Sequence, residues 1–305
     1  MDILITGGTG FVGRALDSAL RAKGHNPVCL GAKDCDLTRQ DSLARFNDKK
    51  YEYIYHLAAW SRAGDFCRLH PGEQWIINQQ INTNVLSWWQ KDQPQAKLIC
   101  PGTSLSYDAQ QEMSEENYLK GIPHLDYFTY AMTKRMLYVG ILALEKQFGL
   151  KYLHLVPDTL YGPDYHTDGR PMHFIYDLIK KIMRGKLYGE PVTLWGDGSE
   201  QRELVLVGDF IQIMLRLLPL CENETVNIAK GQAFPIRGYA RIICERIGYD
   251  FNKVKFDASR SLGTASRCLA VSKLRRILPD AAFIPLESGL DKTIEWFQKE
   301  KDKLL

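Results

Sequence analysis

Short apolar runs alternate with longer segments of helical periodicity through the first half of the chain. The runs have the length and content of buried strands; one starts at residue 3, and others cover 26–30, 53–59, 97–101 and 152–157. Apolar residues at three- and four-residue spacing predict helices after residue 10 and at about 73–90 and 127–148. This alternation predicts a parallel α/β sheet with helices on both faces.

The second half of the chain loses the strict alternation after Gly162-Pro163, which marks a loop. The segment 173–185 has a helical apolar stripe, whereas 192–204 predicts a hairpin or loop. A final helix over about 286–299 is expected to bury Trp296 and Phe297.

No internal repeat or linker divides the sequence, so we expect two interleaved domains. The first would comprise 1–165 with roughly 203–225, and the second 166–202 with 226–305.

Three glycines follow the first strand at three-residue spacing. Gly7 would let the chain turn, Gly10 would let backbone N–H groups approach a pyrophosphate, and Gly13 would let the helix pack on the strand. The helix N-terminus would add unpaired donors and a partial positive charge. A glycine-rich turn without a ligand is the alternative. Because the motif directly follows an apolar strand, we predict a dinucleotide site here.

Composition narrows the class of protein. The 305 residues are 45% hydrophobic and 25% charged, as in ordinary globular proteins, and the formal net charge of +3 points to no nucleic-acid partner. No apolar run approaches the roughly 20 residues that cross a bilayer. The first strand starts at the initiator Met, so we expect no signal peptide.

The seven cysteines are scattered, odd in number and without a Cys-x-x-Cys pair. This pattern favours free thiols over a disulfide framework or a zinc site. We therefore expect a cytoplasmic protein with no metal centre.

The residues after the second strand lie where the adenine ribose of a dinucleotide is usually bound. An acidic residue there favours NAD through the 2′-hydroxyl, and a cation suits the 2′-phosphate of NADP. The chain has Gly31-Ala32-Lys33, then Asp34, with Asp36-Leu37 as an expected adenine-edge contact. Lys33 would meet a 2′-phosphate or be a solvated loop lysine. The choice between NAD(H) and NADP(H) therefore stays open, with NAD(H) preferred.

Tyr130 and Lys134 lie four residues apart in a predicted helix and so on one face. A nearby lysine cation would lower the pKa of the phenol, which would then move a proton while nicotinamide exchanges a hydride. Such pairs also occur by chance; this one gains weight from the glycine turn and from Thr103. Thr103 follows a strand at the edge where parallel sheets bind ligands, and a locally satisfied turn hydroxyl is its alternative.

Several residues of the second half suit an anionic ligand. Lys181 lies on the polar face of 173–185, where a solvated face is the ordinary interpretation. Trp195 and Arg202 suit a base and a phosphate, although a core tryptophan is equally common.

Together these residues make the chain similar to the extended short-chain dehydrogenase/reductase family of nucleotide-sugar epimerases, dehydratases and reductases. The resemblance covers nearly the whole length and rests on the glycine turn, His56-Leu-Ala-Ala59, the Thr103 region, Tyr130-x-x-x-Lys134, Leu160-Tyr-Gly-Pro163 and Trp195-Gly-Asp-Gly with Arg202. It implies a Rossmann, doubly wound parallel sheet with helices on both faces and a smaller mixed α/β domain for a nucleotide-sugar substrate. It also implies a homodimer through the helix that carries Tyr130 and its neighbour.

Within this family the chain is most similar to the GDP-fucose synthases, through the segments 195–204 and 261–267. His173 matches their acid/base histidine, and a histidine packed at a domain seam is the alternative. Two positions depart from their pattern: Leu105 replaces a cysteine that partners the histidine in epimerisation, and Cys268 replaces a lysine near the nucleotide.

The resemblance implies three groups of site residues. The catalytic group is Thr103, Tyr130, Lys134 and His173. The cofactor group is Gly7, Thr9, Gly10, Phe11, Val12, Lys33, Asp36, Leu37, Leu57, Ala58, Ala59, Tyr130, Lys134, Pro157, Thr159 and Leu160. The substrate group is Ser104, Leu105, Ser106, His173, Lys181, Trp195, Arg202 and Arg267.

Because leucine at position 105 cannot move a proton, we predict an NAD(P)-dependent dehydrogenase or reductase. It would act at C4 of a nucleotide-activated sugar, with a GDP-mannose, GDP-6-deoxyhexose or GDP-heptose type preferred. The alternative is an epimerase or epimerase/reductase that uses His173. A dinucleotide-sensing binding protein is a third hypothesis.

Overall fold

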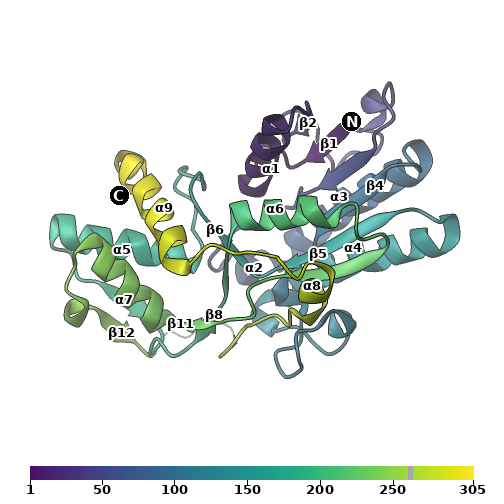
Figure 1. Cartoon of the computed structure of the whole chain (residues 1–305). Coiled ribbons are helices and arrows are strands. Elements are labelled where there is room, and N and C mark those ends of the chain that lie inside the picture. Colours follow the sequence, from purple (N-terminus) through teal and green to yellow (C-terminus); the bar gives the residue numbers. More distant parts are fainter. Residues whose placement is uncertain (260–263) are drawn as a thin grey trace.

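Six parallel strands form the central sheet of the computed structural model, which describes residues 1–259 and 264–305 (Figure 1). Their order across the sheet is β10-β5-β4-β3-β1-β2. The strands are β1 (Ile3–Thr6), β2 (Val28–Leu30), β3 (Tyr53–His56), β4 (Lys97–Pro101), β5 (Tyr152–Pro157) and β10 (Glu224–Ile228). The order in which successive strands are added reverses at β1, with β2 on one side and β3 on the other, so the connections after β1 and β3 leave the carboxyl edge of the sheet on opposite sides of this point.

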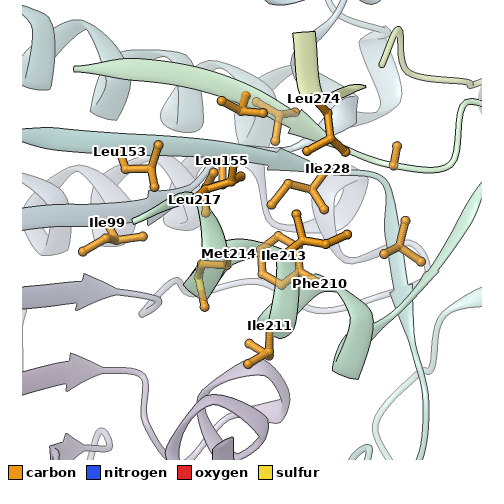
Figure 2. Close-up of a cluster of buried hydrophobic side chains, with 14 of the residues drawn as sticks. Ile99, Leu153, Leu155, Phe210, Ile211, Ile213, Met214, Leu217, Ile228 and Leu274 are labelled. Carbon is orange, nitrogen blue, oxygen red and sulfur yellow. The ribbon is translucent and has the colours of Figure 1, made fainter. Parts of the chain in front are cut away.

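Helices cover both faces of this sheet, as expected. One face packs against α3 (Pro71–Asp92) and α4 (Phe128–Phe148), which lie against each other. The other face packs against α1 (Phe11–Ala22), α6 (Val207–Leu217) and α8 (Ser272–Ile277). Figure 2 shows the side chains of α6 facing Leu155 and Ile228 of the sheet.

The remaining elements form a second layer, at the left of Figure 1, with its own core. The helices of this core are α5 (Phe174–Tyr188), α7 (Ile236–Ile247) and α9 (Leu286–Lys299). Three two-stranded sheets complete it: β6 (Thr159–Tyr161) with β9 (Leu204–Leu206), β7 (Thr193–Trp195) with β12 (Lys255–Asp257), and β8 (Gln201–Arg202) with β11 (Phe234–Pro235). The short helices are α2 (Phe66–Leu69), α10 (Lys301–Leu304), η1 (Ala44–Phe46), η2 (Ser104–Ser106), η3 (Glu115–Asn117), η4 (Leu125–Tyr127) and η5 (Phe251–Lys253).

The structure confirms several predicted elements residue for residue, among them β4, β5 and the last long helix α9, where Trp296 and Phe297 are buried. Of the two alternatives for 192–204, a hairpin or a loop, the hairpin is wrong. Its strands pair with distant partners, and a turn through two left-handed glycines, Gly196 and Gly198, separates them. The second strand begins at Val28, after Pro27, which has no N–H to donate to a neighbouring strand.

The domain division remains our proposal, and the packing moves its boundary. Strand β10 belongs to the six-stranded sheet, and α8 packs on it, although the sequence assigned 226–305 to the second domain. The reason is that 224–228 pairs with β5 in parallel register, which the apolar pattern alone does not reveal.

All seven cysteines are free thiols. In the part of the chain that the structure describes, no helix combines the length and apolar character needed to cross a bilayer.

Gly13→Ala tests the tight packing of α1 on the strand turn. An added Cβ would lie 2.3 Å from the Gly7 carbonyl oxygen, so we expect the free energy of unfolding to fall by about 1–3 kcal/mol. Gly72→Ala in α3 is the matched control, because a Cβ there meets nothing within 4 Å and alanine favours a helix by up to about 1 kcal/mol. Urea denaturation measures both variants; equal stabilities would contradict this packing.

Candidate active site

The glycine turn packs closely against the edge of the sheet on two sides. Gly7 has φ +70°, and an added Cβ would lie 2.7 Å from the Ala58 backbone nitrogen, so the turn lies against the end of β3. On the other side, Gly31 allows the turn to approach, since a Cβ there would lie 2.5 Å from Thr9 Oγ1. Gly10 precedes α1 without a side-chain cap, which leaves the first N–H groups of the helix facing the strand ends.

The predicted apolar cofactor residues are distributed around this edge. Leu57 and Ala58 are partly exposed, and Ala59 is exposed, directly after β3. Phe11 packs edge-on against Tyr165, with ring centroids 5.1 Å apart, which joins the start of α1 to the loop after β6. Val12 and Leu160 are partly buried, whereas Pro157 and Thr159 are buried at the end of β5 and the start of β6.

The loop after β2 carries a carboxylate held next to the glycine turn. Asp34 Oδ2 accepts a hydrogen bond from the Gly31 backbone N–H at 2.8 Å, while Lys33 is exposed. Asp36 accepts bonds from the N–H and hydroxyl of Thr38, and these lower the pKa of the Asp36 carboxyl. The Leu37 side chain is buried in the core, and the adenine contact of Asp36-Leu37 stays a prediction.

Lys134 joins helix α4 to the end of β4. Its ammonium donates to the Pro101 carbonyl at 3.0 Å, two residues before Thr103, and only 7% of the residue is exposed. Tyr130, one turn earlier on α4, is partly exposed and forms a hydrogen bond with Ser61. Thr103 Oγ1 accepts a bond from the Leu105 N–H at 3.3 Å. The structure therefore brings all three predicted catalytic groups to the same strand edge.

The expected acidification of the Tyr130 phenol is not present in this structure. Burial raises its pKa, and a negative charge on Cys67 would raise it further. Burial also lowers the pKa of Lys134 to about 8. The physical reason is that desolvation disfavours both charged groups, while the ammonium is directed to a carbonyl.

A buried polar chain lies behind Lys134. Thr6 Oγ1 bonds His56 Nδ1 at 2.8 Å, His56 Nε2 bonds Asn82 Oδ1 at 3.1 Å, and Asn82 donates to the Thr133 carbonyl at 3.5 Å. Burial lowers the pKa of His56 to about 4, which keeps the ring neutral. This chain connects β1, β3, α3 and α4 at the level of the site.

The predicted substrate residues after β4 are mostly buried. Ser106 is fully buried; its hydroxyl donates to the Ala131 carbonyl and accepts from Tyr118. Ser104 is also buried, so of this group only Leu105 is partly exposed. The Arg135 guanidinium holds the loop in place by donating to the Ser106 carbonyl at 2.9 Å.

His173 directly precedes α5, and part of the residue is exposed. Burial lowers its pKa to about 4, and the charge of Arg267 lowers it further. A neutral imidazole can accept a proton. The acid/base role of His173 stays a prediction.

Two of the predicted substrate-binding arginines lie close to each other. Arg267 donates from Nε to Asp158 at 3.1 Å, while burial and the charge of Arg267 lower the pKa of Arg202. Lys181 instead pairs with Asp177 at 2.8 Å and lies over the Trp195 ring at 5.2 Å. The residues 261–263 of the motif that ends at Arg267 lie outside the described residues.

Sequence reasoning missed Asp158, Ser61 and Asn82. Asp158 directly follows β5, so the rule that ligands gather at strand ends would have found it. Ser61 and Asn82 carry no local signal, because their positions depend on packing between distant segments.

The fold and this edge define a dinucleotide-binding enzyme of the doubly wound class. The chain matches the model of the NAD dependent epimerase/dehydratase family over residues 3–229. It belongs to that family.

Individual relatives cover nearly the whole chain. The GDP-L-fucose synthase of Dictyostelium discoideum is 27% identical, over 97% of this chain and 94% of its own. The structure of a GDP-L-fucose synthetase from Naegleria fowleri bound to NADP has a TM-score of 0.85 and 22% identity, covering 99% and 95%. A GDP-6-OMe-4-keto-L-xylo-heptose reductase from C. jejuni has a TM-score of 0.86 and 20% identity, covering 98% of each chain.

We expect stability to decline in mild acid because buried histidines are held neutral. His154 is buried, and its pKa is lowered to about 3, so the unfolded chain takes up a proton below pH 6.5 and the folded chain does not. Stability is therefore complete above pH 6.5 and is lost as the pH falls, by about 2 kcal/mol per such histidine between pH 7 and 5.

His154→Gln should flatten this dependence relative to the wild type, and His70→Gln, at an exposed histidine, should not. Denaturant midpoints of each protein at pH 7 and 5 measure the change in stability. Parallel curves for the wild type and His154→Gln would refute the assignment.

Proposed function

We propose that this protein is an NAD(P)-dependent oxidoreductase that interconverts an alcohol and a ketone at C4 of a GDP-linked sugar. The observation that carries the proposal is that Tyr130, Lys134 and Thr103 share the strand edge on which the glycine turn opens. The names of the relatives, a GDP-L-fucose synthase and a GDP-heptose reductase, support the substrate class.

The chemistry divides between the cofactor and the protein. Bound nicotinamide supplies or accepts the hydride. Tyr130 gives a proton to the oxygen at C4 in the reducing direction and takes it back in the oxidising direction, and Thr103 binds the same oxygen. Lys134, with a pKa of about 8, supplies a positive charge beside the developing negative charge on that oxygen.

The nucleotide end of the substrate would bind across the second layer. Arg202 and Arg267 suit a diphosphate, because planar guanidinium groups bond phosphate oxygens in pairs. Trp195 is partly exposed and offers a flat apolar face to a base.

A second candidate is an epimerase/reductase of the GDP-L-fucose synthase type. The neutral, exposed His173 favours it, since such a ring can accept a proton from a carbon next to a ketone. Leu105 provides no second proton carrier. In D2O, uptake of deuterium at C3 or C5 of the 4-keto sugar would establish epimerisation and exclude the pure reductase.

We infer a homodimer through α3 and α4. Helix α4 exposes Met136 and Val139, and α3 exposes Trp75 and Ile76, which leaves apolar side chains on two neighbouring helices. A solution mass equal to one chain would refute this inference.

Tyr130→Phe removes the proton carrier and keeps the ring. Turnover of GDP-4-keto-6-deoxymannose, followed by NAD(P)H absorbance, should fall about 10²–10⁴-fold, whereas the Kd of the cofactor should change little. Tyr138→Phe, farther along the same helix, is the matched control and should keep its turnover. A Tyr130→Phe enzyme that works at the wild-type rate would remove this residue from the chemistry.

We propose NAD(H) as the preferred cofactor, supported by the Asp34 carboxylate fixed beside the glycine turn. A negative charge there binds a ribose 2′-hydroxyl and repels a 2′-phosphate. We expect NADH to bind at least ~10-fold more tightly than NADPH, and Asp34→Asn to narrow the difference. Fluorescence titration measures both. Tighter binding of NADPH to the wild type would overturn the preference and leave the proposed reaction intact.

A further inference from the structure

We propose that Asp158 is a positioning residue that holds the Arg267 guanidinium in the orientation needed to bind the diphosphate of the nucleotide sugar. The inference rests on the proposed function, and it deepens that function by assigning a role to a residue that does not itself touch the ligand.

Asp158, Thr159 and Arg267 form a closed ring of hydrogen bonds. Arg267 donates from Nε to Asp158 Oδ1 at 3.1 Å and from Nη2 to Thr159 Oγ1 at 2.7 Å. Thr159 in turn donates to Asp158 Oδ1 from its backbone N–H at 2.6 Å and from its hydroxyl at 3.1 Å. The Asp158 side chain is completely buried, and 13% of the Arg267 side chain is exposed. A planar guanidinium bonded along one edge to a fixed, buried partner has a fixed direction.

Arg267 lies near two other titratable groups. Burial and then the charge of Arg267 lower the pKa values of Arg202 and His173. Among the described residues, the hydrogen bonds of Arg267 use Nε and Nη2, which leaves Nη1 available to a ligand. Two guanidinium groups therefore lie close together, one of them paired with the buried Asp158 carboxylate. Guanidinium groups arranged in this way suit an anion with several oxygens.

A second carboxylate fixes the backbone next to Arg267. Glu203 is fully buried and accepts bonds from the N–H groups of Leu269 at 3.1 Å and Gly231 at 2.6 Å. Leu269 is two residues after Arg267, so Glu203 holds the segment while Asp158 orients its side chain. Burial and the charge of Asp158 raise the pKa of Glu203 to about 7.

The buried Asp158 carboxylate lowers the stability of the fold. Its Oδ2 atom is buried and has no hydrogen-bond partner among the described residues, and the neighbouring Glu203 carboxyl is repelled. A buried acceptor without a partner lowers stability, and an uncharged residue would avoid the cost. A role in holding Arg267 accounts for an acid at this position.

The test compares Asp158→Ala with Asp158→Asn, using GDP as the probe in calorimetric titration and GDP-4-keto-6-deoxymannose in turnover assays. Asp158→Ala should weaken GDP binding at least ~10-fold and raise KM by a similar factor, with kcat and the Kd of the cofactor nearly unchanged. Asp158→Asn keeps an acceptor at Oδ1 and should recover most of the GDP affinity. Asp280→Ala, which breaks the exposed pair of Asp280 with Arg216, is the matched control and should have no effect.

The outcomes separate this inference from the proposed function. A wild-type protein that binds neither GDP nor another nucleoside diphosphate would refute both. If Asp158→Ala folds and binds GDP as tightly as the wild type, only the role of Asp158 is refuted. If Asp158→Ala lowers the melting temperature and kcat together and also weakens cofactor binding, the residue is merely structural. If Asp158→Ala does not fold, Asp158→Asn is the decisive variant. A loss of GDP affinity in Asp158→Asn as large as the loss in Arg267→Met would then overturn the inference.

Discussion

The hydrogen bond from the Lys134 ammonium to the Pro101 carbonyl is the interaction on which the site depends. Burying an ammonium is unfavourable, and one strand-end carbonyl offsets only part of that cost, as the lowered pKa of the lysine shows. The bond links α4 to the end of β4, one turn after Tyr130 on the same helix. The chain of polar groups from Thr6 to Asn82 supports the same contact from behind.

The alternating half of the fold could be predicted from the sequence because each strand is a short apolar run between turn residues. Strands β4 and β5 and helix α9 have bounds that the apolar pattern alone defines. Strand β10 and the 192–204 region could not be predicted in this way. Their pairing partners are distant in the sequence, and two-residue segments such as 201–202 and 234–235 take strand geometry only because a neighbour is present.

The same distinction applies to the site. Local motifs identified the glycine turn and the pair Tyr130 and Lys134, since helix geometry alone sets their spacing. The electrostatics could not be read from spacing: a lysine four residues from a tyrosine acidifies it only if the ammonium is directed at the phenol, and here it is directed at a carbonyl. Likewise Arg267 was expected at the substrate, but its buried partner Asp158, more than a hundred residues away, appears only in three dimensions.

The pairing of β6 with β9, and of Arg267 with Asp158, means that the chain crosses repeatedly between its two layers. Neither layer is made of one continuous stretch of sequence. A ribosome that has finished the first 200 residues has therefore not yet supplied β9, α6 or β10, and the central sheet lacks an edge strand until residue 228 emerges. Folding of the sheet must consequently wait for most of the chain, and the nascent protein presents an apolar edge that cellular chaperones are suited to shield.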